Sequence, residues 1–279
     1  MRLLPRRLEH GEEATVVEHL GELRTRIIFC LIALAATFSV SYYFHDRLLD
    51  WLNRPLPINP TTHQQIKPVT LAVTEPFLTS FWVSLWAAFF LAAPIILWQA
   101  WGFFAPAFQK HAQRVVIGFA AFSGVLLAAG VLFGYFVVTK PAIHFLTSYD
   151  STKYDIQIQA KSYYPFVMLI LVACAIVFEL PIFMLAMARI GILPADRLRR
   201  NRRLGYVIVA AIAVALPGID PVTTTLEMIP LMILFELSIW MVILFDKRWK
   251  RRAAEREAEW EREYADTLGF GDGIEADAI

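Results

Sequence analysis

The stretch YPFVMLILVACAIVFELPIFMLAMA, Tyr164–Ala188, is an almost unbroken apolar run with one carboxylate, that of Glu179, inside it. A run of this length predicts a membrane-spanning helix. At ~1.5 Å per residue, Glu179 lies roughly 22 Å from the first residue of the run and roughly 13 Å from the last, so its side chain does not easily reach either headgroup layer. Pro181 predicts a bend beside this buried acid, because proline removes a backbone hydrogen bond of the helix.

An ionisable side chain at that depth is costly unless it faces a wet cavity or a partner, and this cost favours a functional role for Glu179. The alternative is a structural acid that hydrogen-bonds a neighbouring helix and only holds the bundle together. The apolar run 226–245 contains two more acids, Glu227 near its start and Glu236 at its middle. We predict that Glu179 and Glu236 are the intramembrane polar residues used in transport.

The whole chain has the composition of an integral membrane protein. Of its 279 residues, 57% are hydrophobic and 18% are charged, whereas soluble proteins have roughly 25% charged residues. Six apolar segments predict an all-α protein with six transmembrane helices, over about residues 27–44, 76–101, 115–138, 164–188, 205–219 and 226–245. The fifth covers only ~22 Å of a ~30 Å hydrocarbon core, so we expect neighbouring helices to shelter it in a concave bundle.

The distribution of positive charge predicts the orientation in the membrane. Of the 26 Lys and Arg residues, 20 lie in the N-terminal segment, in the connections 102–114 and 189–204, and in the tail from residue 246. Positive residues favour the cytoplasmic side, so both termini are expected in the cytoplasm. The membrane domain, 27–245, would then separate a cytoplasmic N-terminal segment, 1–26, from a charged cytoplasmic tail, 246–279.

The loop from His45 to Glu75 lies on the opposite side of the membrane in this topology. It contains four prolines, Pro55 among them. Because proline restricts the backbone and lacks an N–H group, this composition predicts a rigid, non-helical excursion over the bundle. We expect a small periplasmic cap.

The segment HLGELRTR, 19–26, precedes the first apolar run and offers carboxylates to a ligand. Glu18 and Glu22 are four residues apart and share a helix face, whereas Arg24 and Arg26 are expected to point elsewhere, toward anionic headgroups. A pair of carboxylates can hold a guanidinium through charge-assisted hydrogen bonds. The alternative is an ordinary first turn, in which acids favour the helix dipole.

Six short motifs, in this order, resemble those of the twin-arginine translocase subunit TatC family. They are HLGELRTRI, 19–27; TEPF, 74–77; PIILWQAWGFFAPAFQKH, 94–111; FGYFVV, 133–138; FELP, 178–181; and LFELS, 234–238. The resemblance covers roughly residues 15 to 250. It implies a receptor for signal peptides with paired arginines, and an oligomeric membrane core to which TatA-type and TatB-type single-span proteins bind. Such a complex moves folded proteins across the bacterial cytoplasmic membrane with the energy of the proton gradient.

The resemblance also assigns roles to single positions. For signal-peptide binding it implies Glu22 and Arg24, for transport Glu179, and for the periplasmic loops Pro55 and Asp220. We add to the signal-peptide site Glu18, one helical turn from Glu22, and Lys110 and His111 of the third motif. Three departures from the family pattern matter. Ala112 stands where the family commonly has a second signal-binding glutamate, and Trp82 where it has a lysine. Pro217 and Thr224 replace a threonine and a glutamine of the expected partner-docking site.

A proton-coupled secondary transporter of a small solute is the main alternative, because buried acids can relay protons. Against it, the chain shows no evident inverted repeat and no matching pair of broken helices. An enzyme is not expected, since no His lies inside a predicted span and no nucleophile has a base beside it in sequence. The pattern predicts no metal site, no cofactor and no nucleic-acid partner.

Overall fold

The computed structural model describes residues 16–58, 65–103, 112–150, 153, 156–190, 192–215 and 221–267. The prediction of an all-helical protein is confirmed, because in this part of the chain β pairing is limited to two isolated bridges. The helices are α1 Val16–Tyr43, α2 His45–Asn53, α3 Glu75–Phe103, α4 Ala112–Phe133, the π-helix η2 Gly134–Thr139, α5 Lys140–Ser148, α6 Ala160–Phe178, α7 Leu180–Ile190, α8 Ala195–Arg200, α9 Arg202–Ala215 and α10 Pro221–Thr267.

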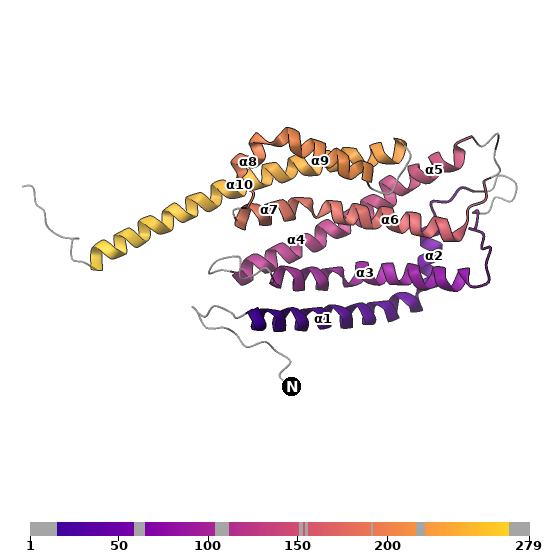
Figure 1. Ribbon diagram of the computed structural model, residues 1–279, viewed down its shortest axis with the longest axis horizontal. Coiled ribbons are helices and arrows are strands. Elements are labelled where there is room, and N and C mark those ends of the chain that lie inside the picture. Colours follow the sequence, from indigo (N-terminus) through magenta and orange to yellow (C-terminus); the bar gives the residue numbers. More distant parts are fainter. Residues whose placement is uncertain are drawn as a thin grey trace, which may run out of the picture.

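The long helices lie side by side in the order of their contacts. Helix α1 packs on α3, α3 on α4, α4 on α6, and both α7 and α9 pack on α10 (Figure 1). We call the end where α1 begins, α3 ends and α8 lies the basic end, because α8 and its surroundings carry Arg197, Arg199, Arg200, Arg202 and Arg203. The opposite end, where α2 lies, is the capped end.

Among the described residues, five helical stretches are long and apolar enough to cross a membrane: Leu20–Tyr43, Glu75–Phe103, Ile117–Ser148, Ala160–Ile190 and Pro221–Arg248. The protein is therefore a multi-pass membrane protein by its helix lengths and composition. The predicted fifth span falls on α9, which has 14 residues and continues toward residues outside the described part. Six crossings thus stay a prediction.

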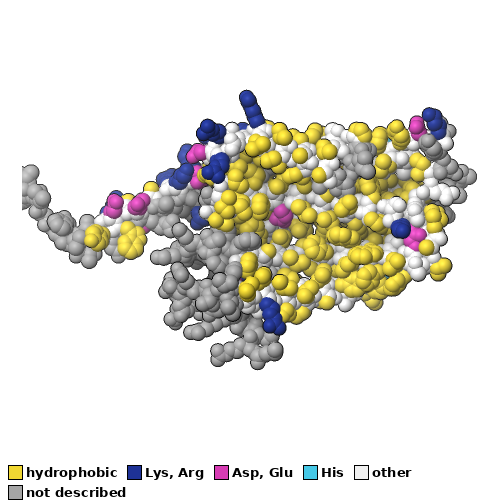
Figure 2. All heavy atoms as spheres, in the orientation of Figure 1, with side chains coloured by type: hydrophobic (Ala, Val, Ile, Leu, Met, Phe, Trp, Pro, Cys, Tyr) yellow, Lys and Arg dark blue, Asp and Glu magenta, His cyan; other side chains and the backbone are white. Residues whose placement is uncertain are grey.

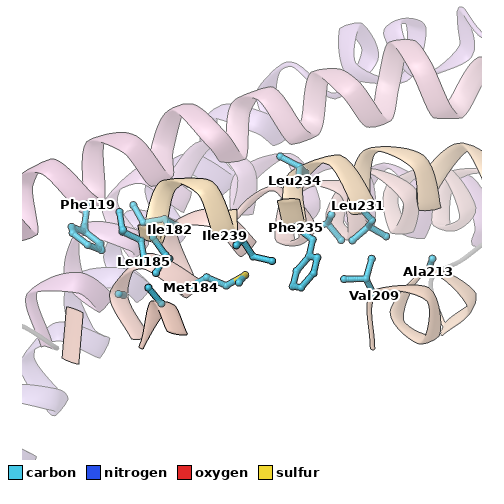
Figure 3. Close-up of a cluster of buried hydrophobic side chains, with 14 residues drawn as sticks. Phe119, Ile182, Met184, Leu185, Val209, Ala213, Leu231, Leu234, Phe235 and Ile239 are labelled. Atoms are coloured by element: carbon cyan, nitrogen blue, oxygen red, sulfur yellow. The ribbon is translucent and has the colours of Figure 1, made fainter. Parts of the chain in front are cut away.

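A hydrophobic core lies between α4, α7, α9 and α10. Buried side chains from all four helices point toward one another, among them Phe119, Leu185, Val209 and Ile239 (Figure 3). The visible outer surface is also largely hydrophobic, with basic side chains gathered mainly near the basic end (Figure 2). Apolar residues inside and outside are the pattern expected of a bundle that has lipid as its solvent.

Close contact between α4 and α6 depends on Gly130. A Cβ atom there would lie 2.7 Å from the carbonyl oxygen of Cys174 and 2.9 Å from the Cα of Ala175, both of them backbone atoms. Small residues allow this approach of two helix backbones, which supplies much of the packing energy between helices in lipid. By contrast, a Cβ at Gly124 on the same helix would meet nothing within 4 Å.

We expect Gly130→Ala to lower the free energy of unfolding by about 1–3 kcal/mol, because the two helices must move apart. The matched control is Gly124→Ala, which should be neutral or stabilising by up to ~1 kcal/mol, since alanine favours helix where space is free. Thermal unfolding of the two purified variants in the same detergent measures the difference. Equal melting temperatures would contradict the packing argument.

The capped end corrects one prediction. The loop after His45 is not wholly non-helical, because residues 45–53 form α2 and the prolines begin only after it, with Pro55 in the turn that follows. Leucines on one face of α2 face the bundle, and Leu52 is 2% exposed. Burial of that face stabilises the short helix where its composition alone would not.

Three tyrosines hold the end of α2 onto the bundle. The hydroxyl of Tyr135 donates to the carbonyl of Trp51 at 2.6 Å, that of Tyr163 donates to the carbonyl of Leu52 at 2.6 Å, and that of Tyr164 contacts the Asn53 side chain at 2.9 Å. The rings of Trp51 and Tyr135 also stack, with centroids 3.9 Å apart. These contacts leave α2 a fixed layer over this end of the bundle.

Candidate functional site

Glu179 interrupts the long apolar run at the position where the sequence predicts a bend. Helix α6 ends at Phe178 and α7 begins at Leu180, so that Glu179 caps the first helix and Pro181 lies in the first turn of the second. Proline is tolerated in a first turn, where its missing N–H is not needed. The helix is therefore interrupted at the residue beside which the sequence predicts a bend, and the carboxyl group lies at this interruption.

The carboxyl group of Glu179 joins three helices. The Ser123 hydroxyl of α4 donates to its Oε2 atom at 2.5 Å, and the Trp101 indole N–H of α3 donates to the Ser123 oxygen at 3.0 Å. Its Oε1 atom is buried and has no hydrogen-bond partner among the described residues. A buried carboxyl oxygen without a partner is costly, so this atom is suited to receive a donor from a bound group.

Glu236, the second predicted transport residue, is engaged in a different way. Its Oε1 atom accepts a short hydrogen bond from the Tyr206 hydroxyl, and its Oε2 atom lies 3.5 Å from Nη1 of Arg202. Both partners belong to α9. This arrangement favours a role in holding the short α9 helix against α10, in addition to any role in transport.

At the basic end, the structure corrects the expected direction of Arg26. Its Nε and Nη2 atoms donate to Oε1 of Glu22, at 3.0 and 2.5 Å, so the two side chains form an ion pair one helical turn apart. The same guanidinium reaches α3, where Nη1 donates to the side-chain oxygen of Gln99 at 3.0 Å. The i,i+4 spacing that relates Glu18 to Glu22 also relates Glu22 to Arg26, and opposite charges at that spacing attract. Arg24 is exposed, as expected.

Comparison with known families now bears on these sites. The family described as "Sec-independent protein translocase protein (TatC)" matches residues 18–230, most of the length of the chain. The chain belongs to the TatC family. Members of this family are components of a protein translocase, so this is a transport protein of the membrane.

Individual relatives are similar over nearly their whole length. The TatC protein of Desulforapulum autotrophicum is 33% identical over 247 residues, covering 88% of this chain and 90% of that protein. The TatC protein of Escherichia coli K12 is 32% identical over 227 residues, covering 81% of this chain and 86% of that protein. Among solved structures, a crystal structure named Twin Arginine Translocase Receptor TatC in DDM is 31% identical. It has a TM-score of 0.70 and covers 80% of this chain and 98% of that one.

Several predicted site residues of this TatC family member fall where their side chains cannot be placed. Lys110, His111 and Asp220 lie outside the described residues, as does Pro217. Glu18 and Ala112 lie in the first turns of α1 and α4, where the structure describes the backbone alone. Among the residues whose side chains are described, Glu22 lies with Arg26 and Gln99 in one cluster. Glu179 lies with Ser123 and Trp101 in another.

Glu75, in the motif TEPF, is a buried acid to which the resemblance assigns no role. It is 5% exposed, and its Oε2 atom accepts the backbone N–H of Leu71 at 2.8 Å and of Ala72 at 3.2 Å. Its Oε1 atom accepts the backbone N–H of Lys161, the second residue of α6, at 2.9 Å. Glu75 thus ties both loops of the capped end to the start of α3.

A cavity of about 410 Å³ lies beside Glu75, between α3 and α6. Trp82 lines it together with Trp86 and Met168. The cavity wall on this side is therefore aromatic and apolar. Among the described residues, no group of three His, Cys, Asp or Glu side chains could hold a metal ion.

Proposed function

We propose that this protein is the signal-peptide receptor and core membrane subunit of a twin-arginine translocase, which exports folded proteins across the bacterial cytoplasmic membrane with the energy of the proton gradient. Membership of the TatC family and the likeness to a crystallised twin arginine translocase receptor support the proposal. The observation that carries it is the Glu22 carboxylate, which already binds a guanidinium at the basic end of the bundle. That group is the chemical feature which distinguishes a twin-arginine peptide.

The proposed topology has six crossings, with the basic end and both termini in the cytoplasm and the capped end in the periplasm. The gathering of basic side chains near one end supports it (Figure 2). The membrane domain would be 27–245, flanked by the cytoplasmic segments 1–26 and 246–279. The proposed residue roles are Glu18, Glu22, Arg24, Lys110 and His111 in signal-peptide binding, Glu179 and Glu236 in transport, and Pro55 and Asp220 in the periplasmic loops.

The proposed partners are TatA-type and TatB-type single-span proteins, in an oligomeric complex. Helix α1 supports this part of the proposal, because it lies at one edge of the bundle (Figure 1). None of the 18 residues in the apolar stretch of its span is buried. A second apolar helix could pack on such a face within the membrane. Glu179, with its unpartnered Oε1 atom, is the proposed contact for a polar group of a partner.

Site-directed crosslinking tests the receptor role. A photo-reactive residue at position 20, where Leu20 is 58% exposed and two residues from Glu22, should crosslink a signal peptide with paired arginines. The same peptide with paired lysines should crosslink at least tenfold less, because an ammonium lacks the planar fork of a guanidinium. The control position is Tyr149, 64% exposed at the capped end. Equal crosslinking of the two peptides at position 20 would refute the receptor proposal.

A further inference from the structure

The guanidinium of Arg26 occupies a site built from two helices. Glu22 supplies a carboxylate oxygen, which Nε and Nη2 approach at 3.0 and 2.5 Å. Gln99 supplies two more acceptors, because Nη1 lies 3.0 Å from its Oε1 atom and 3.3 Å from its backbone oxygen. All three nitrogen atoms of the guanidinium are therefore bonded, and the acceptors approach it from two different helices.

Gly102 completes the site. A Cβ atom there would lie 2.5 Å from Nη1 and 3.2 Å from Cζ of Arg26, so the guanidinium lies directly against the bare backbone of α3. The site is nevertheless open to solvent, since the Arg26 side chain is 22% exposed and that of Glu22 is 27% exposed. A group that arrives from the basic end can therefore reach the same acceptors.

We propose that Glu22, Gln99 and Gly102 form the seat for one arginine of a twin-arginine signal peptide, and that Arg26 fills this seat until the peptide displaces it. The proposal rests on the proposed function and names additional residues of that site. An incoming guanidinium would make the same bonds that Arg26 makes, so the exchange leaves no acceptor unpaired. Gln99, Gly102 and Arg26 would then determine specificity together with Glu22.

The geometry explains how such a seat selects arginine. Glu22 accepts from Nε and Nη2 and Gln99 accepts from Nη1, so the acceptors match the fork of N–H donors of a guanidinium. A lysine ammonium is a compact point charge without a planar fork of donors. It cannot reach the acceptors on both helices at once. The internal arginine also lowers the apparent affinity for the peptide, because the peptide binds only during the fraction of time in which the seat is vacant.

The competing explanation is that Arg26 is a permanent strut between α1 and α3. Another polar contact joins these helices farther along, where the Thr37 hydroxyl donates to the carbonyl of Ala88 at 3.0 Å. A strut and a displaceable occupant predict opposite changes in peptide affinity when Arg26 is removed. Removal of a strut should loosen α1 and weaken peptide binding, whereas removal of a competitor should strengthen binding.

The test measures the affinity of the full-length protein, in lipid nanodiscs, for peptides with paired arginines and with paired lysines. Arg26→Ala should bind the arginine peptide about tenfold tighter than the native protein does, and should gain little for the lysine peptide. Arg203→Ala is the matched control: Arg203 is exposed on α9 at the same end, so its loss should change both affinities alike. Gln99→Leu in the Arg26→Ala background should abolish the gain.

Two further measurements keep the proposal testable if Arg26→Ala is unstable. Arg26→Lys retains the charge and the reach but occupies the seat less well. It should therefore also bind the arginine peptide more tightly than the native protein does, by a smaller factor than Arg26→Ala. Methylguanidinium should raise the melting temperature of Arg26→Ala more than that of the native protein. No gain in either variant would overturn the displaceable seat. If the native protein does not distinguish the two peptides, the proposed function itself fails, which is a separate result.

Discussion

Replacement of Glu179 by alanine is expected to reduce export of a twin-arginine cargo by roughly tenfold to a hundredfold, while the affinity for the signal peptide stays nearly unchanged. The acid lies between α6 and α7, and it accepts a hydrogen bond from Ser123, which itself accepts one from Trp101. None of these residues belongs to the site around Glu22. Its loss removes the acceptor of a buried hydroxyl and the carboxyl oxygen available to a partner. Export of a reporter protein, measured beside peptide binding, separates the two effects.

Two companion variants divide the roles of Glu179. Glu179→Gln keeps the shape and the acceptor for Ser123 but cannot ionise. Ser123→Ala keeps the acid and removes its hydrogen bond of 2.5 Å. If charge matters, the Gln variant should export poorly and the Ser123 variant should retain most of its activity. A fully active Gln variant would reject a role for the charge, and the acid would then be a structural link between helices.

Glu22→Gln should weaken binding of a twin-arginine peptide by about a hundredfold. The resemblance places Ala112 where the family commonly has a second glutamate, so we expect the charge that holds a guanidinium to depend heavily on Glu22. The matched control is Glu255→Gln in the tail. Glu255 pairs with Arg251 one turn away at 3.0 Å, the same i,i+4 spacing with the Arg first, on an exposed surface, and its loss should not change peptide affinity.

The same measurement can ask which acid compensates for Ala112. Ala112→Glu should tighten binding, and Glu18→Gln should weaken it more in the native chain than in the Ala112→Glu background, because Glu18 lies one turn from Glu22. Peptide affinities for the four combinations decide the matter. Equal effects of Glu18→Gln in both backgrounds would assign Glu18 to the start of the helix and not to the ligand.

What the sequence predicted well was local in the chain. The apolar run around Glu179 and the proline after it predicted a long helix that is disturbed beside Glu179, and the structure has a helix break there, because both signals lie within a few residues of the break. The partners of Glu179 were missed, because Ser123 is 56 residues away and nothing near it in the chain marks it as a ligand. Gln99 was missed for the same reason, since 73 residues separate it from Arg26.

Two other errors had local causes. Helix α2 was not predicted because the four prolines of its loop favour a non-helical backbone, whereas the leucine face that stabilises the helix lies before them. The Glu22–Arg26 pair was not predicted because Glu18 and Arg26 have the same i,i+4 spacing to Glu22, and spacing alone does not decide between them. Family resemblance could not reveal this pair either, because a motif gives the identity of residues and not which of them are in contact.

Helix α10 continues without a break from the bundle into the charged tail, and this continuity has a mechanical consequence. Its 47 residues make a rod about 70 Å long, and the 19 residues beyond Arg248 account for roughly 28 Å of it. The helical tail beyond the span acts as a lever: a tilt of about 10° where it leaves the span moves its far end sideways by about 5 Å. Small rearrangements around Glu236 and Arg202 would therefore become large displacements where Trp260, 70% exposed, meets the solvent.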